Sequence, residues 1–145
     1  MTPSNEALTV TPRAHWVLGY AEAVARERAH TGVGPEHIQL AILYNPYSIP
    51  TKVLAVTGVE PDAIADTLSA AMNSPDYHPP IEHHGTLIAA GNIARALKHE
   101  FIGVEHLQLA ILGNRECLAT RELERAGVHP GDFEEALRTK IRAYR

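Results

Sequence analysis

The chain of 145 residues has little of several features that mark common classes of protein. It holds one cysteine, Cys117, so no disulfide can form within it. Its longest uninterrupted apolar run, Leu40 to Tyr44, is far shorter than the ~18 residues that a membrane helix needs. Residues 1–6 carry neither the basic nor the apolar stretch of a secretory signal. These absences predict a cytoplasmic protein that does not act at a membrane.

Positive charge is also scarce. The net charge is −4 and only three lysines are present, so no basic field attracts phosphate backbones and we expect no nucleic-acid binding. The motif G-x-x-x-x-G-K-[ST] is absent, so the sequence contains no P-loop that could bind the phosphates of ATP. With 45% hydrophobic and 21% charged residues, the composition is still that of a folded globular protein.

What the sequence does contain is an internal repeat with an offset of 69 residues. The segment GPEHIQLAIL at 34–43 returns as GVEHLQLAIL at 103–112. From the pair 14/83 to the pair 68/137, 21 of the 55 aligned pairs are identical, without a gap. Unrelated segments of ordinary composition would agree at about one position in fifteen. The chain is therefore a tandem duplication.

Each copy is predicted to form four helices. Thr11 followed by Pro12 favours a capped helix start, and apolar residues then recur at spacings of three and four. The repeated segment is apolar almost all round, which fits a buried strand as well as a buried helix. The acidic residue in its first turn and its helical neighbours favour a central helix. Gly58 and Gly127 suit the ends of the third helices, and no segment shows strand alternation bounded by hairpin signals.

We therefore expect an all-α fold, a tandem repeat of two four-helix units with about eight helices and pseudo-two-fold symmetry. The predicted boundaries are a loose leader at 1–8, a first repeat at 9–72, a linker at 73–82 and a second repeat at 83–145. Three prolines within 73–80 predict an extended, semi-stiff connector. The two repeats are expected to pack as one domain.

The order of these motifs resembles the N-terminal Clp repeat domain of ClpA- and ClpC-type AAA+ unfoldases. The resemblance rests on T-P-R-A at 11–14, on G-x-E-H at 34–37 and 103–106, and on L-x-x-x-G-V at 54–59 and 123–128. It covers residues 9–142. The ATPase modules of those unfoldases have no counterpart in these 145 residues, which leaves open both a free-standing protein and a part of a longer one.

The resemblance implies a non-catalytic module that binds proteins or peptides without a cofactor. Such a module would recognise substrates or adaptors for a Clp unfoldase, or act as its stand-alone competitor or decoy. Phosphoarginine and cyclic-peptide antibiotics are the further ligands that the resemblance suggests. The alternative is a purely structural helical interaction domain with a degenerate groove. A small enzyme would need a convergent set of acid, base or nucleophile, and the sequence shows none.

The same resemblance indicates the candidate ligand-binding residues. In ClpC domains, glutamates that match Glu36 and Glu105, with a threonine that matches Thr11, recognise phosphorylated arginine. A carboxylate would hold the guanidinium, while the threonine and helix N–H groups would hold the phosphate. The alternative role of both glutamates is structural, a favourable interaction with the helix dipole.

The two copies differ at these positions. The first keeps Thr11 together with Glu36, whereas Pro80 occupies the threonine position of the second. Pro35 and Val104 stand where the family has a threonine before the glutamate. We therefore expect phosphoarginine binding to be asymmetric, with Glu36 of the first repeat carrying most of it.

Histidines are the next candidates. His37 and His106 are predicted to be buried and to donate to a backbone carbonyl. The chain has nine histidines, and His78, His83 and His84 crowd the connector. They lack cysteine partners and the H-E-x-x-H spacing, so we expect no metal site.

Aromatic residues are the last candidates, because they dominate protein interfaces. Trp16 and Tyr20, one helical turn apart, are expected mainly in the core. Tyr47, in the loop after the first central helix, is the better surface candidate. Tyr47 is therefore predicted to be a groove residue, and Pro80 of the connector is a second groove candidate.

Overall fold

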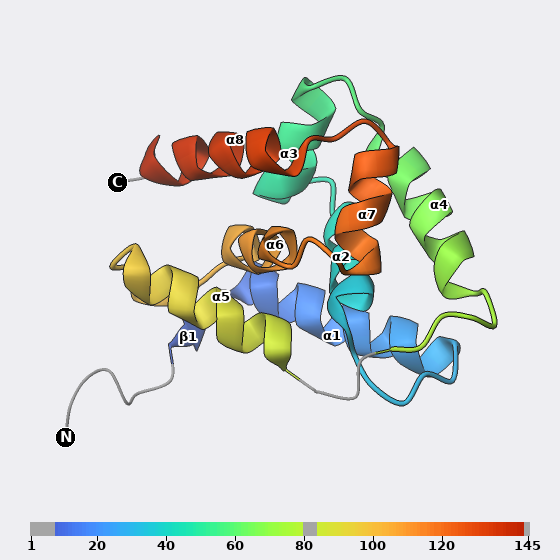
Figure 1. Cartoon of the computed structure of the whole chain (residues 1–145). Helices are drawn as coiled ribbons and strands as arrows, with labels where there is room; N and C mark the ends of the chain where they lie inside the picture. Colours follow the sequence, from blue (N-terminus) through green and yellow to red (C-terminus); the bar gives the residue numbers. More distant parts are fainter. Residues whose placement is uncertain (1–7, 80–83, 144–145) are drawn as a thin grey trace.

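The computed structural model describes residues 8–79 and 84–143, and over these ranges the fold is almost wholly helical (Figure 1). The helices of the first repeat are α1 (Pro12–Glu27), α2 (Pro35–Leu43), α3 (Ile49–Val56) and α4 (Pro61–Met72). Those of the second repeat are α5 (Gly85–Ala96), α6 (Val104–Gly113), α7 (Leu118–Arg125) and α8 (Pro130–Ala143). The predicted all-α fold of two four-helix units is confirmed.

The helix ends follow from local sequence. The Thr11 hydroxyl caps α1 by accepting a hydrogen bond from the backbone N–H of Ala14 at 3.1 Å. The chain leaves α3 and α7 through Gly58 and Gly127, whose φ angles are +89° and +95°. Only glycine adopts this left-handed backbone without strain, so the two third helices end as predicted.

A short strand pair is the feature that the sequence patterns did not predict. Strands β1 (Thr9–Val10) and β2 (Phe101–Ile102) lie parallel, with Thr9 opposite Phe101 and Val10 opposite Ile102. Two residues are too few to show an alternating pattern. Just beyond the pair, the backbone N–H of Thr11 donates to the carbonyl of Ile102 at 3.0 Å. The strand pair thus holds the start of α1 beside the start of α6.

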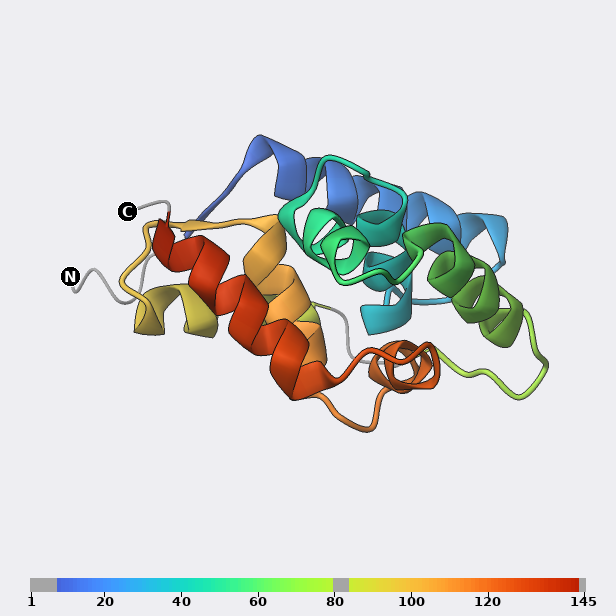
Figure 2. The ribbon, with the colours of Figure 1, turned by 90° about the horizontal axis from the view of Figure 1, so that it is seen from above.

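The central helices α2 and α6 lie in the middle of the molecule. In Figure 1, α1 and α5 run along one side of them and α3 and α8 along the other, while α4 and α7 close one end. Figure 2 shows α1 along one edge of the molecule when it is seen from above. This arrangement explains why both central helices are apolar almost all round, since they are covered on all sides.

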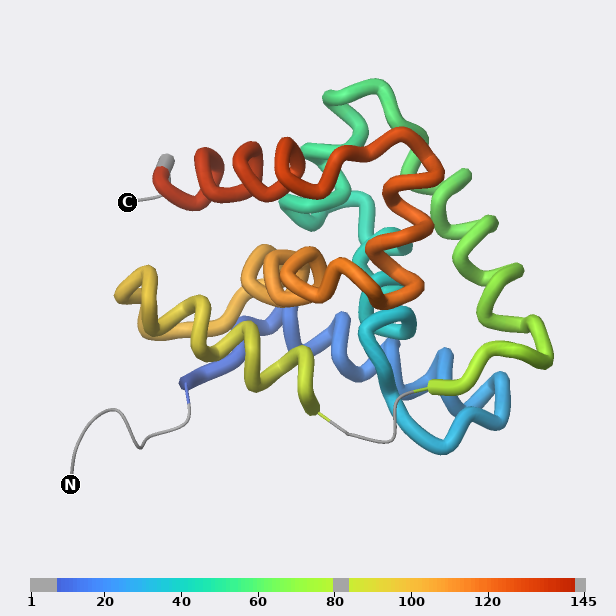
Figure 3. Tube along the Cα trace, in the orientation of Figure 1, coloured from blue at the N-terminus to red at the C-terminus, as the bar shows by residue number. Residues whose placement is uncertain are grey.

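The two repeats interlock rather than sit side by side. The trace in Figure 3 runs through the first repeat and then returns, so that α8 packs on α3 and α7 packs on α4. The larger apolar cluster mixes equivalent leucines of both copies: Leu40 and Leu109, Leu54 and Leu123, Leu68 and Leu137. Neither repeat has a core made only of its own residues.

A reciprocal amide pair marks the place where the central helices meet. The side chains of Gln39 and Gln108 are fully buried, and each donates to the other's carbonyl oxygen, at 2.8 and 2.7 Å. The two residues are 69 positions apart, which is the offset of the repeat. Their exchange of identical bonds is what approximate two-fold symmetry produces at its axis.

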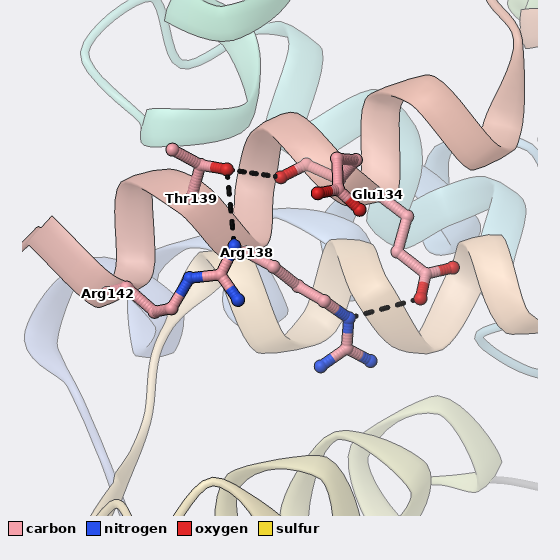
Figure 4. Close-up of polar contacts among 5 residues, drawn as sticks. Glu134, Arg138, Thr139 and Arg142 are labelled. Atoms are coloured by element: carbon pink, nitrogen blue, oxygen red, sulfur yellow. Dashed lines mark hydrogen bonds and ion pairs between the residues drawn. The ribbon is translucent and has the colours of Figure 1, made fainter.

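The surface of α8 is held by polar contacts within the helix (Figure 4). The guanidinium of Arg138 donates to the Glu134 carboxylate one turn earlier at 3.1 Å. Arg142 donates to the Thr139 hydroxyl at 3.4 Å. Contacts of this spacing stabilise a helix by about 0.2–0.5 kcal/mol each. Arg138 and Arg142 therefore stabilise the helix in which they lie.

Candidate functional site

A hollow of about 810 Å³ opens where the start of α1, the loop after α2 and the start of α6 meet. We call it the Thr11–Glu105 hollow. It combines polar, charged and aromatic side chains, among them Thr11, Arg13, Trp16, Tyr44, Tyr47 and Glu105. Both repeats therefore contribute to it, the first through α1 and its loop and the second through Glu105.

One wall of the hollow is the N-terminus of α1. The Thr11 hydroxyl accepts from Ala14, and it donates to no group in the described part of the chain, so its hydrogen can serve a ligand. The guanidinium of Arg13 donates to the backbone carbonyl of Tyr47 at 2.9 Å, which holds the charge at the rim. A helix N-terminus carries a partial positive charge, so this wall suits an anion.

The opposite wall carries the carboxylate of Glu105, in the first turn of α6. This side chain is half-buried and folds back over Gly103, where a Cβ atom would overlap its carboxylate. Among residues 8–79 and 84–143, no side chain or N–H group is paired with it by a hydrogen bond or an ion pair. A carboxylate in this state is available to a cationic ligand group.

The equivalent glutamate of the first repeat has a different environment. Glu36 is only 3% exposed, and both of its oxygens are used inside the protein. Oε1 accepts from the Tyr77 hydroxyl at 2.7 Å, and Oε2 accepts from the backbone N–H of Ala119, in the first turn of α7, at 3.2 Å. Glu36 thus ties α2 to the connector and to the second repeat.

The expected pairing of Thr11 with Glu36 is replaced by a pairing across the repeats. Thr11 and Glu105 line one hollow, whereas Glu36 lies in a larger hollow of about 1200 Å³ with Tyr77 and Cys117. The sequence comparison matched residues by their order within each copy, and it could not show that the start of α1 faces α6. The structure thus places Glu105, and not Glu36, in the hollow that Thr11 lines.

Two substitutions explain why the glutamates differ. With the offset of 69, Ala119 corresponds to Pro50, which has no N–H to offer Glu105. Tyr77 corresponds to Leu8, which has no hydroxyl. Burial and the Glu36 carboxylate both raise the pKa of Tyr77, so its hydroxyl stays protonated and donates. Glu36 has two donors that Glu105 lacks.

Two buried histidines stabilise the starts of the central helices. His37 and His106 are 0% and 1% exposed, as predicted, but their backbone partner is not a carbonyl. The Nδ1 atom of each accepts from the N–H of the preceding cap residue, Gly34 at 2.9 Å and Gly103 at 2.8 Å. The prediction of a carbonyl partner was wrong because the first-turn position of the histidine lets its ring reach back to an unpaired N–H.

Each of these histidines also contacts a second one. His30 Nδ1 lies 2.8 Å from His37 Nε2, and His99 Nδ1 lies 2.8 Å from His106 Nε2. Since Nδ1 of His37 and of His106 accepts from a backbone donor, the neutral ring carries its proton on Nε2. Burial is the main cause that lowers the pKa of His37 and of His106 to about 4, and the neighbouring histidine adds to it.

The aromatic residues depart from the prediction. Trp16 and Tyr20 are 45% and 38% exposed, so the expectation that they lie mainly in the core was wrong. They occupy the outer face of α1, since the apolar stripe that enters the core consists of Ala14, Val17, Ala21, Val24 and Ala25. Tyr47 is 68% exposed and lines the Thr11–Glu105 hollow. Pro80, the other predicted groove residue, lies outside the described residues.

Sequence reasoning did not single out Arg13 as a site residue. The signal available for it was its difference from the second repeat, where Glu82 takes the position of Arg13. A residue that differs between the two copies is a candidate for function, because the fold that both copies share does not require that residue.

Other kinds of site find little support. Over the described ranges, no group of three or more histidine, cysteine or acidic side chains could hold a metal ion, and His83 lies outside those ranges. Cys117 is half-buried at the N-cap of α7, with its sulfur 3.3 Å from the Thr120 hydroxyl, and burial raises its pKa. None of the helices described is both long enough and apolar enough to cross a membrane.

Known proteins match this chain in sequence. It is 27% identical over 117 residues to the ATP-dependent Clp protease ATP-binding subunit ClpC of Staphylococcus aureus, which covers 77% of this chain and 14% of that protein. It is 24% identical over 144 residues to a probable ATP-dependent Clp protease ATP-binding subunit of Chlamydia pneumoniae, covering 92% of this chain and 17% of that protein. The chain therefore spans about a sixth or less of the length of these relatives.

Known structures share the fold. The Hsp104 N-terminal domain of Candida albicans superposes with a TM-score of 0.75 at 17% identity, with 89% of each chain covered. The N-terminal domain of the chaperone ClpD of Arabidopsis thaliana superposes with a TM-score of 0.71 at 16% identity, covering 92% of this chain and 94% of that one. The model of the Clp repeat (R) N-terminal domain matches residues 9–80 and 82–144, and the chain belongs to this family of Clp N-terminal repeat domains.

Proposed function

We propose that this chain is a non-catalytic recognition module that binds peptide segments in the Thr11–Glu105 hollow, and that phosphoarginine is the side chain it recognises there. The observation that carries the proposal is the placement of an unpaired carboxylate opposite a helix N-terminus, across a hollow of about 810 Å³. Phosphoarginine carries a guanidinium and a phosphate next to one another, so it needs an acidic and a basic wall together.

The chemistry of each wall fits one half of this ligand. The Glu105 carboxylate would accept paired hydrogen bonds from the guanidinium. The Thr11 hydroxyl would donate to the phosphate, supported by the positive end of α1 and by the Arg13 charge. The exposed rings of Tyr47 and Trp16 would cover neighbouring residues of the peptide.

The second carboxylate is a poorer candidate. Glu36 would have to leave both the Tyr77 hydroxyl and the Ala119 N–H before it could meet a ligand. We therefore assign one ligand site to the described part of the chain, at Glu105.

The cellular role that we propose is recognition of substrates or adaptors for a Clp unfoldase. It rests on the relatives, which are named as ATP-binding subunits of the Clp protease. A module of this kind acts in the same chain as an ATPase, or as a separate competitor for the same ligands.

Titration calorimetry with a short phosphoarginine peptide tests the proposal. The parent chain should bind, and Glu105→Ala should weaken binding by roughly 10- to 150-fold, the equivalent of about 1.5–3 kcal/mol for a lost charge-assisted contact. Thr11→Val should weaken it by less, since the helix N-terminus and Arg13 remain. The same peptide with unmodified arginine should bind more weakly than the phosphorylated one.

The matched control is Glu124→Ala, which removes an exposed carboxylate from α7 away from the hollow. It should leave the affinity unchanged. Equal losses from Glu124→Ala and Glu105→Ala would reduce the effect to net charge. No binding by the parent chain would contradict the phosphoarginine assignment and favour a purely structural interaction domain.

A further inference from the structure

Three exposed aromatic rings form a continuous surface on α1 and at the end of α2. Trp16, Tyr20 and Tyr44 are 45%, 38% and 40% exposed. The rings of Trp16 and Tyr20 stack with centroids 5.1 Å apart, and the edge contact of Tyr20 with Tyr44 measures 5.8 Å. We call these three residues the aromatic ladder. Scattered exposed apolar residues are ordinary, but contiguous aromatic ones mark interaction surfaces.

The fold does not need this surface. At the equivalent positions the second repeat has Gly85, Ala89 and Gly113, and it forms the same four helices. The core-facing stripe of α1 is made of other residues. The aromatic ladder is therefore a property of the first repeat alone.

Acidic side chains flank one end of the ladder. Burial is the main cause that raises the pKa of Tyr44, and the nearby Arg28 lowers it. The charges of Asp66 and Asp62, together with Tyr20, raise it further. Asp62 and Asp66 are exposed on α4. Glu27, seven residues after Tyr20 on α1, lies exposed on the same helix face.

The basic residues near the ladder are already engaged. Arg28 donates to the Asn73 and Ser69 side chains at 3.1 and 2.5 Å. Arg13 donates to the carbonyl of Tyr47. Both guanidiniums keep their charge, but they are held to neutral groups of the chain itself, whereas the carboxylates of Asp62, Asp66 and Glu27 are exposed. The exposed acidic side chains give this end of the ladder an excess of negative charge, on a chain of net charge −4.

We propose that the aromatic ladder is a docking surface for a basic amphipathic segment of another protein. Apolar side chains of that segment would cover the three rings. Its lysines or arginines would lie over the ring faces and against Asp62, Asp66 and Glu27, since aromatic faces attract cations. A second copy of this chain fits less well, because it would bring the same acidic border.

This inference does not depend on the proposed phosphoarginine site. Tyr20 does not line the Thr11–Glu105 hollow, whereas Trp16 and Tyr44 border both surfaces. A partner long enough to cross both would place its basic segment on the ladder and a neighbouring residue in the hollow. The two sites are separable by substitutions at Tyr20 and Glu105.

Trp16 is the only tryptophan of the chain, so its fluorescence reports binding at the ladder or at the hollow that it also lines. The Tyr20→Ser variant assigns the signal to the ladder, because Tyr20 does not line the hollow. The probe is a synthetic amphipathic helix of lysine, leucine and alanine, with a glutamate-for-lysine peptide of the same length as its counterpart. We expect a saturable change in Trp16 emission with the lysine peptide and none with the glutamate peptide. Asp62→Asn with Asp66→Asn should weaken binding and lower its salt dependence.

Tyr20→Ser and Tyr44→Ser should each weaken the lysine peptide by about tenfold or more, as expected for a central aromatic contact. Thermal unfolding checks that each variant is folded. Ile88→Ser is the matched control, because Ile88 is 60% exposed on α5 of the second repeat, and it should leave binding unchanged. Glu105→Gln should also leave it unchanged, although it disturbs phosphoarginine binding.

Three results would overturn the proposal. Equal binding of the lysine and glutamate peptides would show that the acidic border selects nothing. Unchanged affinity in both tyrosine variants would show that the peptide binds elsewhere. A concentration-dependent dimer in sedimentation equilibrium, lost in Tyr20→Ser, would identify a second copy of the chain as the occupant instead.

Discussion

The two repeats have the same fold, but the equivalent glutamate carboxylate is buried and hydrogen-bonded in one repeat and open to a hollow in the other. Glu36 and Glu105 occupy equivalent places in the first turns of α2 and α6, yet Glu36 is buried with two donors and Glu105 is open to a hollow. The difference arises at positions around the glutamates, where Ala119 and Tyr77 correspond to Pro50 and Leu8. A duplicated residue is therefore not a duplicated function, because its partners decide what it can do.

The features that stayed identical are those that the interior requires. Both copies keep the cap histidine with its histidine neighbour, and both keep the glutamine at the contact between the central helices. The cap histidines and the two glutamines are buried and must be paired. The comparison thus identifies buried polar residues that the interior requires in both copies.

The largest expected effect is a loss of stability in acid that both repeats share. The folded pKa of His37 and of His106, about 4, lies below the unfolded value of about 6.5. The unfolded chain therefore binds more protons between these values. As the pH falls from about 6.5 to 4, each histidine should lower the free energy of unfolding by up to about 1.4 kcal/mol per pH unit. Urea unfolding at several pH values measures this slope.

The variants His37→Gln and His106→Gln should each reduce the pH dependence of the unfolding free energy, and by similar amounts. The exposed His129→Gln is the control and should leave the slope as it is. A slope that survives both cap variants would assign the acid sensitivity to other groups.

The next prediction concerns the pair of glutamines, Gln39 and Gln108, through which the two repeats contact each other. Gln39→Leu should lower the free energy of unfolding by about 1–3 kcal/mol, since it leaves the buried amide of Gln108 without a partner. Chemical denaturation measures it. The double variant Gln39→Leu, Gln108→Leu should recover a large part of the loss, because no polar group is then left unpaired. Additive losses would contradict the role of the reciprocal bonds.

A smaller effect should distinguish the two glutamates directly. Glu36→Gln should cost about 1–2 kcal/mol, because the Ala119 N–H at the start of α7 loses a charged acceptor. Glu105→Gln should change stability by no more than about 0.5 kcal/mol, as for other residues without structural partners. Thermal unfolding of the two variants side by side gives the comparison, and equal costs would remove the distinction between the repeats.

The smallest effect concerns the connector. Tyr77→Phe deletes only the hydroxyl that donates to Glu36, and it should cost about 0.5–1.5 kcal/mol. Tyr47→Phe, on a side chain that is 68% exposed, should cost nothing measurable and serves as the control. Hydrogen exchange of the Ala119 amide should also become faster in Tyr77→Phe. An unchanged stability and exchange rate would show that Tyr77 is not needed to hold Glu36.

The sequence was sufficient for the helices because their signals are local. The cap at Thr11, the left-handed glycines at 58 and 127 and the 69-residue offset are all properties of short segments or of their repetition. The burial of His37 and His106 also followed, since both lie on helices that are apolar almost all round. Their partners did not follow, because a bond from the ring to a cap N–H depends on the side-chain rotamer.

The site required three-dimensional information at two points. Thr11 and Glu105 line one hollow because a two-residue strand pair brings positions 9–10 next to 101–102, and no local pattern encodes such a pairing. The sequence predicts Trp16 and Tyr20, one helical turn apart, mainly in the core, but both are exposed. The stripe of alanine and valine on the other face of α1 fills that place, so the larger rings remain outside.

The interlocking of the repeats has a consequence for how the chain folds. The contacts that join the two repeats connect residues far apart in sequence, such as Glu36 with Ala119, 83 positions apart. Forming them requires the chain to close a long loop before burial repays that entropy. Folding should therefore be a single cooperative event of the whole chain, later than the formation of its local helices. A chain cut in the connector would expose both clusters, and its two halves would each need the other to cover them.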